Sequence, residues 1–468
     1  MKRILYFLLL TFASTNILNS SPPNIVFINV DDWGWADAGF QGSEYYETPN
    51  IDALASSGMV FRHAYAAAAN CAPSRACVMS GQYTPRHGIY TVGSSERGKA
   101  RHRRLIPTRN TTVLDDSVVT IAEELKSVGY ETVTIGKWHL GKNPLTQGFD
   151  INIAGNKAGH PRGYFSPYRN PNLSDGPKGE HLTDRLTSEA IRIIQSPRNS
   201  PLFLYLPFYS VHTPLQGKAE LIAKYKMKRG SKGQSNATYA AMIETLDSNV
   251  GRLVAAIESA GMRENTLVIL TSDNGGIRAV SQQEPLRAGK GSYYEGGIRV
   301  PLIMSWTGKI EAATVSNVPV CGIDFYPTFL ELAKNDSQAN KTLDGQSLVP
   351  LLTQSGALST RALFWHFPVY LQAYKPGLDG SRDPLFRTRP GSAMRWGKWK
   401  LHEYFEDGGV ELYDLDTDPA ESKNLANVQT AKKEELLAKL RRWRVETAAP
   451  VPNNPNPKFE SPTENNLR

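Results

Sequence analysis

The chain has 468 residues, 40% of them hydrophobic and 21% charged, which is typical of a globular protein with one large domain and a smaller appended one. Its formal net charge of +8 would help to attract a polyanionic partner, but the sequence contains no RNA- or DNA-binding motif, so nucleic acid is excluded as the expected partner. The three cysteines, at positions 71, 77 and 321, are too few for a disulfide framework, and the sequence leaves open whether 77 and 321 pair.

The first 20 residues have the pattern of an export signal peptide. Lys2 and Arg3 precede an apolar run over residues 4–13, and small polar residues follow over 14–21. The apolar run is too short to span a membrane, and no cysteine near the expected cleavage site could carry a lipid. We therefore expect the mature chain to begin near Ser20, to have no membrane anchor, and to work in the periplasm or outside the cell.

The first buried strand is predicted over residues 24–30, which are apolar and β-branched and lead to Asp31 and Asp32. Ligands bind at the carboxyl ends of strands in open α/β sheets. Two adjacent carboxylates repel each other there unless a cation lies between them, which favours a divalent metal. A solvated turn is the alternative interpretation.

Cys71 is predicted to lie just before a helix whose first position is Pro73, where a missing N–H costs nothing. Free backbone N–H groups and the helix dipole stabilise an anion at that point, and Arg75 follows one turn later. A cysteine-dependent phosphatase loop does not fit, because Asn70 and Cys77 occupy the positions of its histidine and arginine. The other alternative is a buried cysteine that acts as a small hydrophobic residue.

Two later strands also lead to polar side chains. Strand 131–135 precedes Lys137 and His139, which point the same way if that segment is extended. Strand 201–207 precedes His212. Ammonium and imidazole groups at strand ends suit the binding of an anion and a proton transfer, although packed side chains without a chemical role are the alternative.

The last such strand, 266–271, leads to Asp273 and Asn274, whose carboxylate and amide oxygens are hard metal ligands. An Asp-Asn-Gly sequence on its own would indicate only a turn. A glycine-rich loop over residues 287–301 then carries Lys290. Between the first strands, a basic run over 97–109 is either a solvated loop or a segment that grips a charged polymer.

Helices and strands alternate to about residue 335, which predicts a doubly wound α/β domain over residues 21–350. Besides the elements named above, the pattern predicts helices over 49–58, 118–127, 184–195 and 239–260, and strands over 59–61 and 299–306. Residues 351–468 are predicted to form a smaller subdomain with antiparallel strands at 362–367, 392–401 and 410–413 and a helix at 430–446. The tail from Pro450 is expected to be poorly ordered.

The segment Cys71-x-Pro73-Ser74-Arg75, followed by Ser80-Gly81, resembles the motif of type I sulfatases, in which the cysteine is oxidised to formylglycine (3-oxoalanine). With the strand-end residues and the stretch Glu411-Leu412-Tyr413-Asp414-Leu415, the resemblance covers nearly the whole mature chain. It implies an alkaline-phosphatase-like α/β fold. In this fold a large, mostly parallel central sheet is flanked by helices, and a smaller C-terminal α+β subdomain contains an antiparallel sheet.

The resemblance also implies a role for each candidate residue. A Ca²⁺ would be held by Asp31, Asp32, Asp273 and Asn274 and completed by the modified Cys71. Arg75 and Lys137 would steady the formylglycine, which His139 borders. His212 and Lys290 would contact the sulfate ester. A maturase that generates formylglycine would be a partner during biogenesis.

The implied reaction is the hydrolysis of a sulfate ester. One hydroxyl of the hydrated formylglycine attacks sulfur, His212 protonates the leaving alcohol, and His139 deprotonates the second hydroxyl so that sulfate is expelled. Export and resemblance to secreted bacterial sulfatases imply a sulfated polysaccharide or oligosaccharide, such as algal ulvan or carrageenan. The alternatives are a phosphatase or phosphonate monoester hydrolase of the same fold and an inactive carbohydrate-binding relative.

Overall fold

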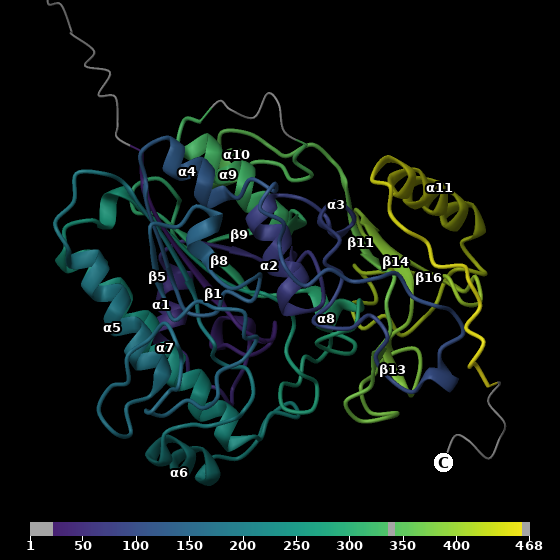
Figure 1. Ribbon diagram of the computed structural model, residues 1–468, viewed down its shortest axis with the longest axis horizontal. Helices are drawn as coiled ribbons and strands as arrows, with labels where there is room; N and C mark the ends of the chain where they lie inside the picture. Colours follow the sequence, from purple (N-terminus) through teal and green to yellow (C-terminus); the bar gives the residue numbers. More distant parts are fainter. Residues whose placement is uncertain (1–21, 336–341, 461–468) are drawn as a thin grey trace, which may run out of the picture.

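The computed structural model describes residues 22–335 and 342–460, and it places a large helix-flanked sheet beside a smaller antiparallel sheet (Figure 1). The predicted signal peptide, residues 1–20, lies outside the described residues. Within the described ranges, no helix combines the length and the apolar character needed to cross a lipid bilayer.

The large sheet has the strand order β5-β4-β6-β1-β7-β8-β2-β9 among the described residues. All neighbouring strands pair in parallel except the two pairs that β8 makes with β7 and β2, so β8 alone runs against the others. The strands, in sheet order, are Ile151–Ile153, Glu131–Ile135, Leu202–Pro207, Asn24–Val30, Thr266–Ser272, Leu302–Ser305, Met59–Phe61 and Thr314–Ser316. The predicted strand 299–306 is thus confined to β8, because a short helix, α8 (Glu295–Ile298), ends just before it.

Helices cover both faces of this sheet, as the continuous apolar strands predict. Alternate residues of β1 point to opposite faces: Val26 and Ile28 pack in one core cluster, whereas Ile25 and Phe27 pack in another. The first cluster is closed by α1 (Pro49–Ser56), α5 (Leu182–Gln195) and α7 (Ala237–Ser259), and the second by α2 (Cys71–Ser80), α4 (Ile121–Ser127) and α9 (Phe325–Leu332). The shorter helices are α3 (Thr84–His87), α6 (Ala219–Met227) and α10 (Val349–Leu352).

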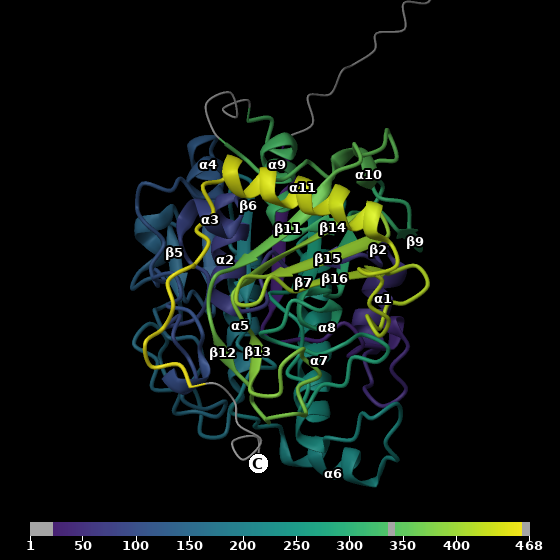
Figure 2. The ribbon, with the colours of Figure 1, turned by 90° about the vertical axis from the view of Figure 1, so that its right-hand side faces the viewer.

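The smaller sheet has the order β11-β14-β15-β16, and α11 (Thr430–Glu446) lies across it (Figure 2). Its strands are Ala362–Phe367, Gly391–Trp396, Trp399–Tyr404 and Val410–Asp414. The prediction of one strand over 392–401 is wrong, because Gly397 has φ +57° and turns the chain between β14 and β15. The described residues also contain two short strand pairs: β3 (Ala64–Tyr65) with β10 (Val320–Cys321), and β12 (Leu371–Gln372) with β13 (Phe386–Thr388).

Aromatic side chains join the smaller sheet to the large domain. Tyr65 packs edge-on against Trp365 with ring centroids 5.4 Å apart, and Tyr293 stacks on Phe367 at 3.9 Å. Both pairs belong to one apolar cluster that contains residues from the two parts of the chain. The two predicted regions therefore share a core, and a domain boundary at residue 350 stays a prediction.

The segment 450–460 is ordered, which corrects the prediction for the tail. Ile106 N donates to Asn454 O at 2.9 Å, and Asn456 N donates to Arg104 O at 2.8 Å. The Arg104 guanidinium also lies 5.4 Å from the centre of the Phe459 ring. The basic run therefore supplies the backbone and cationic partners that order this part of the tail, while residues 461–468 lie outside the described chain.

A buried ion cluster connects α8 to β15. Lys400 Nζ lies 2.8 Å from Glu295 Oε1 and 3.0 Å from Glu421 Oε1, and all three side chains are fully buried. Glu421 also accepts a hydrogen bond from Glu295 N at 2.6 Å. Burial raises the pKa of Glu421 to about 7, and the neighbouring Glu295 acts in the same direction against the opposing effect of Lys400.

This pKa predicts a pH-dependent stability. The folded chain keeps a proton on Glu421 up to about pH 7, whereas the unfolded chain releases it near the ordinary value of 4.5. At this group the folded state therefore binds more protons in this window, so the contribution of Glu421 to the free energy of unfolding should fall as pH rises from 4.5 to 7. Glu421→Gln removes this titration, so the free energy of unfolding of the wild type minus that of the variant, measured with urea, should decrease across the window. Parallel curves for the two proteins would contradict the assignment.

Candidate active site

Four adjacent strands deliver the predicted site residues to one edge of the large sheet. β4, β6, β1 and β7 are neighbours and parallel, so their carboxyl ends meet at the same edge. Beyond these ends lie Lys137 and His139, His212, Asp31 and Asp32, and Asp273 and Asn274. Backbone bonds fix two of the loops to each other, because Asp31 N donates to Ser210 O and Val211 N donates to Asp31 O, at 2.8 and 2.7 Å.

The helix α2 brings Cys71 to this edge. The helix begins at Cys71 with Asn70 as its N-cap, so Cys71 is its first residue and Pro73 its third, two positions later than predicted. Proline is tolerated at the third position as well as at the first, because the first N–H groups of a helix have no intrahelical partner and proline therefore loses no bond there. Cys71 Sγ lies 3.1 Å from Lys290 Nζ and 3.5 Å from Asp31 Oδ1.

Three buried ion pairs surround Cys71. Arg75 contacts Asp273 Oδ2 through Nε at 2.9 Å and Nη2 at 2.8 Å, and its Nη1 donates to the Lys137 carbonyl at 2.9 Å. Lys137 Nζ lies 2.6 Å from Asp31 Oδ2, and Lys290 Nζ lies 2.5 Å from Asp32 Oδ1. Each of these charges is removed from water, so each depends on its partner.

The cations also act on the Cys71 thiol. Burial alone would raise the pKa of this thiol. The ammonium groups of Lys137 and Lys290 have the larger, opposite effect together, so the pKa falls from the ordinary value of 9.0 to about 6. An anion is therefore favoured at the side chain of residue 71 at neutral pH. The geometry suits a group that carries negative charge at this atom.

Oxygen donors at the same place fit a hard divalent cation. Asp32 Oδ2 and Asn274 Oδ1 are buried and have no hydrogen-bond partner among the described residues. Asn274 is oriented by its own amide, which donates to Asp32 Oδ1 at 2.8 Å. Asp31, Asp32, Cys71 and His212 offer ligand atoms that all lie within 4.8 Å of one another. Buried carboxylate and amide oxygens without protein partners are the donor set that Ca²⁺ prefers.

The two histidines approach from separate loops. His212 Nε2 lies 3.6 Å from Asp32 Oδ2, while its Nδ1 is 2.7 Å from the Thr213 carbonyl. His139 has φ +67°, so the segment after β4 turns rather than staying extended as predicted. Burial and the charge of Lys137 lower the pKa of His139, and its Nδ1 has no hydrogen-bond partner in the described chain. His139 is therefore held as a neutral imidazole with an unpartnered Nδ1 among the described residues.

The loop over residues 155–179 adds three residues that the sequence did not indicate. A Cβ at Gly159 would lie 2.5 Å from His139 Cε1, so the loop backbone covers this ring closely. His160 stacks on His212 with ring centroids 6.2 Å apart, and Tyr164 donates its hydroxyl to the His212 carbonyl at 2.8 Å. No motif or periodicity marks these residues, because their contacts arise only from the folded path of the loop.

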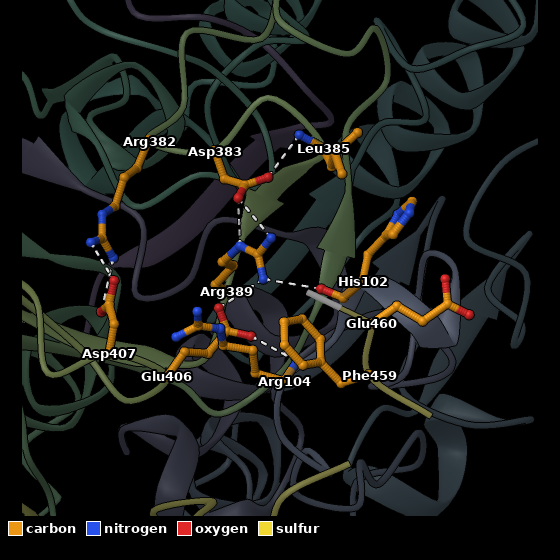
Figure 3. A pocket seen from close by; sticks show the side chains of 10 residues that line it. All are labelled: His102, Arg104, Arg382, Asp383, Leu385, Arg389, Glu406, Asp407, Phe459 and Glu460. Atoms are coloured by element: carbon orange, nitrogen blue, oxygen red, sulfur yellow. Dashed lines mark hydrogen bonds and ion pairs between the residues drawn. The ribbon is translucent and has the colours of Figure 1, made fainter. Parts of the chain in front are cut away.

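A separate cavity of about 330 Å³ lies between the 97–109 segment, the β12–β13 hairpin and the tail (Figure 3). Its charges compensate one another: Arg389 contacts Asp383 at 2.6 Å and Glu406 at 2.7 Å, and Arg382 contacts Asp407 at 2.6 Å. Its lining contains no cysteine, and the group of clustered ligand atoms found among the described residues lies at Asp31, Asp32, Cys71 and His212. The group around Cys71 is therefore the candidate reaction centre.

Comparison with known proteins defines the class to which this fold and site belong. Residues 23–335 match the family model described as Sulfatase, and residues 289–447 match the one described as N-sulphoglucosamine sulphohydrolase, C-terminal. The chain therefore belongs to the sulfatase family, with its alkaline-phosphatase-like fold, and is a sulfuric ester hydrolase.

Relatives that cover most of the chain support this assignment. A sulfatase of Formosa agariphila is 34% identical, with 95% of this chain and 92% of that protein covered. The N-acetylgalactosamine-6-sulfatase of Mus musculus is 29% identical, with coverage of 92% and 81%. The crystal structure of Ps i-CgsB in complex with k-i-k-neocarrahexaose superposes with a TM-score of 0.75 at 28% identity and covers 96% of each chain.

The Arg75–Asp273 pair predicts a large stability effect. Arg75→Met leaves a buried carboxylate without its cation, so we expect the free energy of unfolding to fall by about 3–5 kcal/mol. Arg382→Gln is the control, because it breaks a partly exposed pair with Asp407 and should cost no more than about 1 kcal/mol. Urea unfolding measures both. Equal losses in the two variants would contradict this account of the buried pair.

Proposed function

We propose that this protein is an exported sulfatase that removes sulfate from a sulfated carbohydrate, with an algal galactan of the carrageenan type or an ulvan as substrate. Its nucleophile is formylglycine formed from Cys71 by a maturase, and its cofactor is one Ca²⁺. The observation that carries the proposal is the position of Cys71 Sγ, which lies 3.1 Å from Lys290 Nζ among buried carboxylates. The similarity to a structure that contains neocarrahexaose favours the galactan.

Ca²⁺ would be held by oxygens of Asp31, Asp32, Asp273 and Asn274 together with residue 71. When bound, it supplies positive charge to the sulfate oxygens and lowers the pKa of a hydroxyl beside it. Residue 71, once converted to hydrated formylglycine, would offer one hydroxyl as the nucleophile for sulfur and a second whose deprotonation would allow sulfate to leave.

The side chains around residue 71 have separate roles in charge stabilisation and proton transfer. Lys137 and Lys290 stabilise negative charge at residue 71, since their ammonium groups are buried beside it: Lys290 Nζ contacts Cys71 and Lys137 Nζ contacts the neighbouring Asp31. His212 holds the proton for the leaving alcohol, and its ring is oriented by the Thr213 carbonyl. His139 is the candidate acceptor for the proton of the second hydroxyl at residue 71, because its buried Nδ1 has no hydrogen-bond partner among the described residues.

A phosphatase or phosphonate monoester hydrolase is the rival within this fold. The phosphonate monoester hydrolase of Agrobacterium radiobacter superposes with a TM-score of 0.67 at 21% identity, which establishes a shared fold only. Matched aryl sulfate and aryl phosphate esters separate the two activities. An inactive carbohydrate-binding relative would release neither product.

The central test is modification and turnover. Protein produced with a formylglycine-generating maturase should show, in the peptide that contains Cys71, the mass loss that corresponds to replacing the thiol by an aldehyde. Cys71→Ala should abolish sulfate release, and His212→Ala should lower kcat by about 10²–10⁴-fold. Cys77→Ala is the matched control, because Cys77 is buried on the same helix outside the site and should leave turnover intact. Wild-type rates in Cys71→Ala would contradict the proposal.

The metal is tested by its binding. Calorimetric titration of the purified apoprotein should show one Ca²⁺ per chain, and Asn274→Ala should weaken it at least about tenfold, because a buried neutral oxygen ligand is lost. Bound Ca²⁺ should also raise Tm. Asp344→Asn, in a carboxylate that pairs with Arg86 elsewhere, should leave the affinity unchanged. Tighter binding of Mg²⁺ than of Ca²⁺ would contradict the choice of ion.

A further inference from the structure

A wall beside the reaction centre is built from two distant segments. Residues 95–97 pair with the chain just before β12, because Tyr370 N donates to Ser95 O at 2.9 Å and Arg97 N donates to Tyr370 O at 3.3 Å. From the paired strand β13, Arg387 Nη1 donates to the Lys290 carbonyl at 2.9 Å. Lys290 Nζ contacts Cys71, so a single lysine side chain separates this wall from the reacting position.

Two arginines on this wall have no acidic partner among the described residues. Arg97 Nε donates to Gln372 Oε1 at 3.2 Å, and Arg387 Nε donates to the Gln372 carbonyl at 3.0 Å, so one glutamine holds both guanidinium groups. Neither forms an ion pair with any carboxylate in the described chain. Burial and the charge of Arg387 lower the pKa of Arg97, as expected for two close cations.

This arrangement differs from that of the other arginines in the region. Arg103, Arg382 and Arg389 pair with Glu96, Asp407 and Glu406, respectively. By contrast, both terminal nitrogens of Arg97 and Nη2 of Arg387 donate no hydrogen bond to the described residues. Two adjacent like charges with free donors are unfavourable until an anion lies between them.

Two neighbours shape the space around Arg387. The Tyr374 ring centre lies 3.5 Å from the guanidinium carbon, and this tyrosine is 44% exposed, so it forms the outer rim. Gly291 has φ +84°, and a Cβ there would lie 2.6 Å from Arg387 Nη1. Glycine at this position therefore allows the arginine to reach the backbone of the loop that carries Lys290.

We propose that Arg97 and Arg387 form a subsite for a second anionic substituent, a sulfate or a carboxylate, on the oligosaccharide whose sulfate ester occupies the reaction centre. The inference rests on the proposed function and deepens it by selecting multiply charged substrates. Guanidinium groups present planar pairs of N–H donors that match the oxygens of both anions. Tyr374 places an aromatic face at the rim, where a sugar ring can lie against it.

Binding to the full Cys71→Ala chain tests the subsite without turnover. Calorimetry would compare galactan oligosaccharides of equal length with one sulfate, with two sulfates, and with a carboxylate in place of the second sulfate. We expect a doubly charged ligand to bind more tightly, and Arg97→Gln to weaken it about tenfold while affecting the singly charged ligand less. Arg97→Lys should recover part of the affinity, and Arg382→Gln, whose charge is already compensated, should have no effect.

The outcomes separate the subsite from the reaction. Tighter binding of the disulfated or of the carboxylated ligand identifies the second anion and supports the subsite. Equal affinity for all three ligands, or equal weakening of all three by Arg97→Gln, overturns it. Sulfate release from 4-nitrophenyl sulfate by the matured wild-type enzyme tests the proposed function separately, since that substrate has no second anion.

Discussion

The concentration of buried charge at one edge of the large sheet is the constraint on which the rest of the structure depends. Three carboxylates and three cations lie there with almost no contact with water. Each charge would cost several kcal/mol alone, so the fold must bring every partner within hydrogen-bonding distance. The strand order does this for the carboxylates and Lys137, helix α2 does it for Arg75, and the glycine-rich loop does it for Lys290. These six charges balance among themselves, so a bound divalent cation would add positive charge that an anion at residue 71 and an anionic ester can compensate.

The two sheets contribute different things to the site. The large sheet and α2 supply the group around Cys71, which lies at strand ends that neighbouring parallel strands hold in register. The smaller sheet and the β12–β13 hairpin supply the wall that contains Arg387. The proposed reaction therefore depends on residues that the large sheet and α2 position. The recognition of the remainder of the substrate depends on loops, whose sequence can change without disturbing the buried charges.

The sequence predicted the α/β alternation and the strand ends because both depend on local patterns. Apolar runs of β-branched residues identify buried strands, and the polar residues that end them identify the edge where they meet. The start of α2 was displaced by two residues, because proline is tolerated throughout the first turn. The turn at Gly397 was missed because a single glycine interrupts a stretch that otherwise has the pattern of one strand. The order of residues 450–460, the approach of His160 to His212 and the meeting of Arg97 with Arg387 depend on contacts between distant segments, which no local pattern records.

The buried Lys400 bridges the two parts of the molecule through charge as well as packing. Its partner Glu295 begins the helix that directly follows the loop of Lys290, while Lys400 itself lies in the middle of the antiparallel sheet. Opening the smaller sheet alone would remove Lys400 from the buried carboxylate of Glu295 and leave it the longer, 3.7 Å contact with Arg299, so partial unfolding is penalised at the point where the loop of Lys290 ends. We therefore expect the two regions to unfold as one cooperative unit. A chain cut before the antiparallel sheet would remove Lys400 and, with it, the ion pair that holds the end of the loop of Lys290.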